Sequence, residues 1–159
     1  MTDPVLDPSD EDLATWSRTL APMAFNEVWR LLDKSSLTRD EEEEMLAAAF
    51  AQRHHWYQVG TPRNRAIADW QVSRVAAVLG YADLSSRFGE RSLALAREHE
   101  LGPFVTAFAH EAIARAAAFV DDVTTFTEHL EAARALLADI DDPEERETLE
   151  ADLTEMSER

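Results

Sequence analysis

Two arginines of this sequence each lie one helical turn from a residue that could share a binding site with them. Trp70 precedes Arg74 by four positions, and Glu111 precedes Arg115 by four positions. Residues four apart lie on the same face of an α-helix. A guanidinium binds a carboxylate through parallel N–H donors, while Trp70 and Phe108 would supply flat apolar area. The spacing therefore suits a carboxylate-binding site. An ordinary Glu111–Arg115 ion pair, with Trp70 in the core, explains it equally well.

The adjacent histidines His54 and His55 suggest a metal site, but their spacing argues against one. Neighbouring side chains point about 100° apart on a helix, so the two imidazoles cannot share one ion. Four glutamates at 41–44 and the basic group 53–55 stand near opposite ends of the same expected helix. Both groups complement the helix dipole, which favours a structural role. His54 remains a candidate ligand contact.

No sequence motif indicates a reaction. A zinc-protease helix that began at His110 would need a second histidine where Ala114 stands, and the chain has no cysteine. No glycine-rich phosphate loop or serine elbow is present. We therefore expect no catalytic residue, metal or cofactor. The main alternative to a binding module is an enzyme or small-molecule binder with His54, Arg74 and Trp70 in one pocket.

The charge distribution restricts the partners. A net charge of −17 disfavours nucleic acid and anionic membranes, which attract clustered lysine and arginine. A nucleic-acid mimic is a further possibility, and it would need its acidic groups in a regular ridge. Residues 51–75 form a basic island, in which four arginines against one aspartate give a balance of +3. Arg63 belongs to this island. We therefore expect a protein or peptide partner with acidic residues or a terminal carboxylate, and we leave the oligomeric state open.

The same sequence predicts a cytoplasmic location. It has no basic start followed by a hydrophobic stretch, and no apolar run long enough to cross a bilayer. Residues 1–8 are acidic and contain two prolines, which predicts a loose arm before a single helical-repeat domain over 9–159.

Helix start and stop signals recur at intervals of about 41 residues, which is typical of a helical repeat. They include a capping box at Thr38 and a Gly60-Thr61-Pro62 junction. We expect a short leading helix from Ser9, a final helix after residue 142, and three hairpins between them. The hairpin helices are expected at 22–33, 38–58, 62–79, 83–100, 103–120 and 122–139. The predicted fold is all-α, built of stacked antiparallel hairpins with a C-terminal capping helix; a four-helix bundle is the alternative.

From Trp70 to Ala96 the second hairpin resembles a tetratricopeptide repeat, with Val72 and Ser73 at the large and small inner-helix sites and Gly80 at the turn. The third hairpin is similar. Alanines replace the usual aromatics at positions 76 and 117, and Gly89 replaces another. Because glycine inside a helix costs up to about 1 kcal/mol against alanine, Gly89 predicts either a close helix crossing or a break in the helix.

This resemblance implies that the inner helices line a concave wall. The wall would carry Trp70, Arg74, Phe108, Glu111 and Arg115. The runs 55–62 and 70–75 also resemble a group of uncharacterised actinobacterial single-domain proteins, and that resemblance implies no activity.

Overall fold

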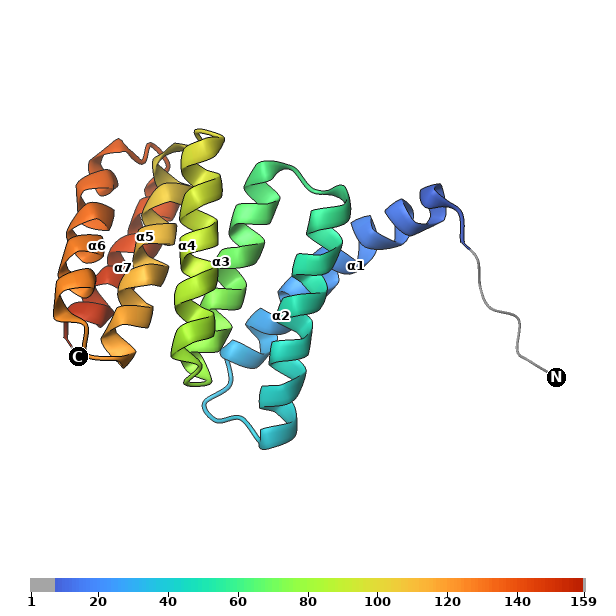
Figure 1. Cartoon of the computed structure of the whole chain (residues 1–159), viewed down its shortest axis with the longest axis horizontal. Helices are drawn as coiled ribbons and strands as arrows, with labels where there is room; N and C mark the ends of the chain where they lie inside the picture. The colour runs from blue at the N-terminus through green and yellow to red at the C-terminus, as the bar shows by residue number, and fades with distance from the viewer. Residues whose placement is uncertain (1–7, 159) are drawn as a thin grey trace.

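The computed structural model describes residues 8–158, and within that range every regular element is a helix and no strand is present. The predicted arm therefore lies outside the described residues, apart from Pro8. Figure 1 shows the order of the helices along the molecule. They are α1 (Asp10–Leu32), α2 (Arg39–Val59), α3 (Pro62–Val78), α4 (Ala82–Glu98), α5 (Gly102–Phe119), α6 (Val123–Leu136), the short 3₁₀ turn η1 (Leu137–Asp139) and α7 (Pro143–Ser157).

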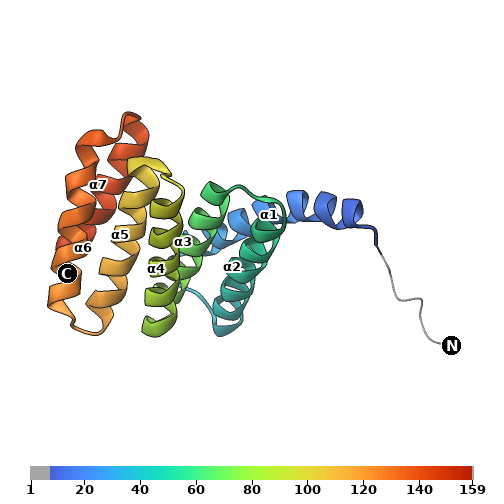
Figure 2. The ribbon, with the colours of Figure 1, turned by 45° about the horizontal axis from the view of Figure 1, so that its top comes forward.

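Each helix packs against its neighbour in sequence, so α1–α2, α3–α4 and α5–α6 form antiparallel hairpins that stack side by side (Figures 1 and 2). The inner helices α1, α3 and α5 also meet one another. The Trp29 and Trp70 ring centroids are 5.9 Å apart, and Gln71 donates a hydrogen bond of 3.1 Å to the Phe25 carbonyl oxygen. Helix α7 packs chiefly on α5. The predicted stacked hairpins with a C-terminal helix are confirmed.

The predicted caps set most of the helix boundaries. Thr38 and Thr61 each accept a hydrogen bond from the backbone three residues later, and Asp142 caps α7. Gly80 follows α3 with φ of +81°, a left-handed conformation that favours glycine.

The first hairpin differs from the prediction, because α1 is one continuous helix that contains Pro22. A proline inside a helix removes one backbone hydrogen bond. Packing compensates for this loss, since Ser17 and Ala21 before the proline and Val28 and Leu31 after it are all buried. Water can also reach the exposed residue 22. The leading helix and the helix over 22–33 are therefore one element.

Helices α4 and α5 cross closely at Gly89, as the sequence predicted. A Cβ atom at this position would lie 3.2 Å from Ile113 Cγ1 and 3.3 Å from the Ile113 backbone nitrogen. Helix α4 ends at Glu98, two residues before the expected boundary at 100, and Gly102 opens α5 with φ of +87°.

Helix α5 is the most enclosed element, because α3, α4, α6 and α7 all contact it. Its buried side chains include the polar residues His110, Glu111 and Arg115. A buried charge must be paired, so these residues fix the arrangement of the surrounding helices. None of the helices in residues 8–158 is both long and apolar enough to cross a membrane.

Thr61→Ala is expected to lower the free energy of unfolding by about 1 kcal/mol. The substitution removes the hydroxyl that accepts from the Asn64 backbone N–H at 3.3 Å, so this N–H loses its capping acceptor. The Asn64 Oδ1 atom loses the hydroxyl donor but still accepts from the Thr61 backbone N–H at 3.0 Å. Urea denaturation followed by circular dichroism measures the change. Thr124→Ala, at an exposed position of α6, is the control and should shift stability by less than about 0.5 kcal/mol. An unchanged midpoint for Thr61→Ala would show that the cap contributes nothing.

Candidate functional site

Three adjoining hollows follow the inner face of the molecule, and we call them together the inner groove. The first, of about 310 Å³, is lined by rings from α1, α3 and α5. The second, of about 430 Å³, shares Trp29 with the first and is lined by both Arg74 and Arg115. The third, of about 380 Å³, shares Arg115 and Phe119 with the second. The rings of the first hollow belong to Phe25, Trp29, Trp70, Phe104 and Phe108.

A fully buried carboxylate, Glu111, lies beneath the groove and holds its wall together. Its Oε1 accepts hydrogen bonds from Arg115, through Nε at 2.7 Å and also through Nη2. Its Oε2 accepts from Trp70 Nε1 at 3.2 Å. Arg74 Nη1 is 4.0 Å from the same Oε1. The ordinary Glu111–Arg115 ion pair that the spacing allowed is therefore present, and Trp70 is buried.

Arg74 is also held by Asp152 from α7, a residue that the sequence reasoning did not identify. Arg74 Nη1 donates to Asp152 Oδ2 at 3.2 Å. The Arg74 guanidinium carbon is 5.9 Å from the Trp29 ring centroid and 5.8 Å from that of Trp70, within the range of a cation–π contact. The pairing with Asp152 and Glu111 competes with any carboxylate ligand that approaches Arg74.

The repeat period explains why these residues meet. Steps of 41 residues connect Trp29, Trp70, Glu111 and Asp152, and the same step connects Arg74 with Arg115. Equivalent positions of successive inner helices are neighbours in a stacked repeat. Asp152 could therefore have been found from the sequence by adding one period to Glu111.

The electrostatics of the groove are balanced rather than positive. Glu111 and Asp152 neutralise the two arginines. The second hollow is also lined by Asp33, Glu42 and Glu155 and by Lys34, which pairs with Glu41. Each guanidinium carries five N–H donors. Within the described residues Arg74 donates one side-chain hydrogen bond and Arg115 two, both to Glu111. Donors on both arginines therefore remain for a second acceptor.

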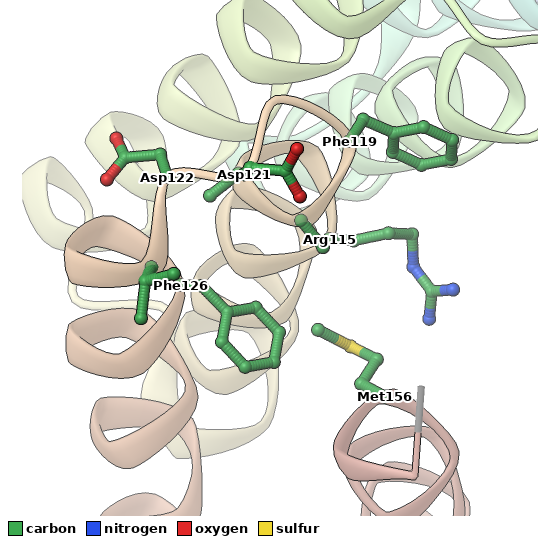
Figure 3. A pocket seen from close by; sticks show the side chains of 9 residues that line it. Arg115, Phe119, Asp121, Asp122, Phe126 and Met156 are labelled. Carbon is green, nitrogen blue, oxygen red and sulfur yellow. The ribbon is translucent and has the colours of Figure 1, made fainter.

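The third hollow is lined mainly by apolar side chains, together with Arg115, Asp121 and Asp122. Figure 3 shows Phe126 and Met156 facing each other across it, with the Arg115 guanidinium extending past Met156 and Phe119 beyond. Phe119 is 48% exposed, which is high for a phenylalanine. This hollow can accept an apolar side chain beside the arginine.

The structure brings five of the seven predicted site residues to the groove: Trp70, Arg74, Phe108, Glu111 and Arg115. It places the other two elsewhere. Arg63 is exposed at the opposite end of α3, where it lies 3.8 Å from Glu145. His54 is exposed on α2 and lines none of the three hollows. A pocket of His54, Arg74 and Trp70 is therefore not assembled in the groove.

The remaining histidine of the adjacent pair has a structural contact. His55 Nδ1 lies 3.1 Å from the Ser17 hydroxyl and thereby joins α2 to α1. Burial, with a smaller effect from His54, lowers the pKa of His55 below its ordinary value.

Three of the four basic-island arginines pair with acids among the described residues: Arg53 with Asp69, Arg63 with Glu145 and Arg74 with Asp152. The fully buried Asp69 accepts from Arg53 Nε at 2.5 Å and from the Tyr57 hydroxyl at 2.6 Å, which ties α2 to α3. Burial, followed by the hydrogen bond to Asp69, raises the pKa of Tyr57. Since Arg74 has Asp152, much of the +3 balance is neutralised by acids that pack against the island.

A pair of histidines lies between α5 and α6, outside the groove. The Nδ1 atoms of His110 and His129 are 2.8 Å apart, so one ring donates a hydrogen bond to the other. Burial lowers the pKa of His110 to about 4, with contributions from His129 and Arg97. Burial also lowers the pKa of His129. Among residues 8–158, no group of three or more His, Asp or Glu side chains is placed to hold a metal ion.

Comparisons with models of protein families, with curated proteins and with solved structures find no match to this chain. The inner groove is therefore interpreted from its own geometry.

Proposed function

We propose that the protein is a tetratricopeptide-like binding module and that its inner groove holds the C-terminal end of a partner protein. The last carboxylate of the partner binds between Arg74 and Arg115, and its last side chain enters the third hollow. One observation carries this proposal. Both guanidiniums face the same Glu111 oxygen and line the same hollow, and both keep unused donors. Two converging arginines are a strong arrangement for a single carboxylate.

A terminal carboxylate fits this groove better than a run of acidic residues. The first carboxylate of a ligand accepts hydrogen bonds from the guanidiniums of Arg74 and Arg115. Each further acidic side chain of the ligand meets Asp33 and Glu42 around the second hollow, where Lys34 is already paired with Glu41, within a chain of net charge −17. Like charges placed together disfavour binding. The surroundings of the arginines therefore favour the carboxylate-ended ligand over the generally acidic one.

The neighbouring hollow favours an apolar last residue. Phe119, Phe126 and Met156 line the third hollow, which adjoins the Arg115 guanidinium. A side chain buried there would remove apolar surface from water on both molecules. The chemistry of recognition is thus one carboxylate and one adjacent apolar group. Because His54 lies elsewhere, the placement of the side chains does not favour the small-molecule or enzyme alternative.

Arg74→Gln and Arg115→Lys are each expected to weaken binding by about tenfold or more, because a hydrogen bond to a charged group is worth about 1.5–3 kcal/mol. The ligand is obtained by selecting a random peptide library displayed with free C-termini, and titration calorimetry then measures its affinity. Arg115→Lys keeps a positive charge beside the buried Glu111 but loses the planar guanidinium with its parallel N–H donors.

Arg63→Gln is the matched control, because it removes another basic-island arginine of α3 that lines none of the three hollows, although its guanidinium carbon lies 5.8 Å from the Phe104 ring centroid of the first hollow. This variant should bind within about twofold of the wild type, since surface ion pairs contribute little. Full affinity in both groove variants, or a library that yields no binding peptide, would contradict the proposal.

A further inference from the structure

Helix α1 carries a row of large apolar side chains that the other described residues leave about half exposed. Leu13, Trp16, Leu20 and Met23 are 46%, 47%, 42% and 61% exposed. Their separations of three, four and three residues match the a and d positions of a heptad. We call these four residues the α1 stripe. Isolated exposed hydrophobics are ordinary on protein surfaces, but a row at coiled-coil spacing indicates a helix that packs against another helix.

The α1 stripe is separate from the face of α1 that packs inside the molecule. Ser17, Ala21, Val28 and Leu31 form the buried face, and α1 packs on α2. Figure 1 shows the N-terminal half of α1 extending past α2, away from the remaining helices. A second helix could therefore reach the α1 stripe without displacing any of the other described helices.

The charge pattern indicates what can cover the stripe. Residues 13–26 contain one charged side chain, Arg18, and no acidic one. The three residues before this segment are all acidic, and Glu27 follows it. In a chain of net charge −17, an acid-free segment is a place where an equally acidic molecule can approach without close repulsion. A second copy of this chain has that charge and presents the same apolar spacing.

We propose that two copies of the chain associate through their α1 stripes as an antiparallel, two-fold symmetric helix pair. In this arrangement Leu13 packs on the partner's Met23, and Trp16 packs on the partner's Leu20. The pairing is self-complementary, as a two-fold interface requires. A parallel pair would bring together the acidic residues at 10–12 of both copies, whereas the antiparallel pair separates them.

The available area makes this dimer weak and reversible. Four side chains of this size, each about half exposed, offer on the order of 400 Å² per copy and therefore about 800 Å² per pair. A standard stable interface buries about 1,200–2,000 Å² in total. Salt should strengthen the dimer, because it screens the repulsion between two chains of net charge −17.

Sedimentation equilibrium over a range of protein concentrations tests the pairing. The weight-average mass of the wild type should rise from 17.9 kDa towards twice that value, and more steeply at high salt. Trp16→Glu and Leu20→Glu should stay monomeric. Val123→Glu alters a 71% exposed residue of α6 and should behave as the wild type. A wild type that is monomeric at millimolar concentration, or stripe variants that still dimerise, would overturn the proposal.

Disulfide cross-linking tests the orientation, since the chain contains no cysteine. Thr19 is at a g position, which faces its own counterpart across an antiparallel pair but not across a parallel one. Thr19→Cys should therefore form a covalent dimer on mild oxidation. Arg18→Cys is the matched control, because the f position points away from the partner. Equal cross-linking of both variants would contradict the antiparallel pair.

Discussion

Replacing Glu111 with alanine should lower the free energy of unfolding by about 3–5 kcal/mol, because it removes one partner of a buried ion pair. The Arg115 side chain is buried and gives both of its side-chain hydrogen bonds to Glu111, and Trp70 Nε1 donates to the same carboxylate. All these donors would lose their acceptor in a region that water reaches poorly. Chemical denaturation at neutral pH measures the loss.

Glu43→Ala provides the comparison, because it also breaks an ion pair with an arginine four residues away. Glu43 lies 3.6 Å from Arg39, but both side chains are exposed. A pair of this kind contributes about 0.3–0.5 kcal/mol. If the Glu111 and Glu43 variants lose similar amounts of stability, the buried carboxylate does not hold the inner helices together.

Lowering the pH from 7.5 to 4 should remove about 3 kcal/mol of stability through His110 alone. The pKa of His110 is about 4 in the folded protein, against an ordinary value of 6.5. The unfolded chain therefore binds the proton more readily than the folded chain. Stability is fully present above pH 6.5, falls as the pH drops through the window between these two pKa values, and changes no further from this group below pH 4.

Urea denaturation at several pH values, for the wild type and for His110→Gln, isolates this contribution. The variant should lose less stability than the wild type over the same interval, because its residue 110 does not titrate. His99→Gln, at an exposed position of the chain, should keep the wild-type pH dependence. Parallel curves for the wild type and His110→Gln would show that the buried histidine does not control acid sensitivity.

The fold was accessible from the sequence because its signals are local. A cap such as Thr38 with Glu41, or a junction such as Gly60-Thr61-Pro62, acts within a few residues. Pro22 shows the limit of such signals. The sequence pattern favoured a helix start there, but the burial of α1 residues on both sides against α2 keeps the helix continuous.

The candidate site was accessible only in part, because its geometry depends on contacts between repeats. Spacing on one helix related Glu111 to Arg115. The hydrogen bond from Trp70 to Glu111 and that from Arg74 to Asp152 span 41 and 78 residues. To predict these hydrogen bonds from the sequence, one would need to know which positions of successive hairpins lie side by side. When the period of about 41 residues is applied to side chains as well as to loops, Trp29 and Asp152 occupy the positions equivalent to Trp70 and Glu111.

The pairing of the arginines also could not be read from composition. A balance of +3 over residues 51–75 says how many charges are present, whereas binding depends on which acids lie beside them. Asp69 comes from the island itself, but Asp152 comes from the last helix. Of the two ligands that the sequence left open, acidic residues and a terminal carboxylate, we therefore propose the terminal carboxylate.

The most direct test of the inner groove compares two forms of one selected peptide, with a free C-terminal carboxylate and with a C-terminal amide. Titration calorimetry on the wild-type protein measures both affinities under the same conditions. Because the amide removes the charged acceptor and leaves every side chain in place, we expect the amide to bind more weakly by about tenfold or more. Equal affinities for the acid and the amide would contradict it, since Arg74 and Arg115 would then not bind the terminal carboxylate.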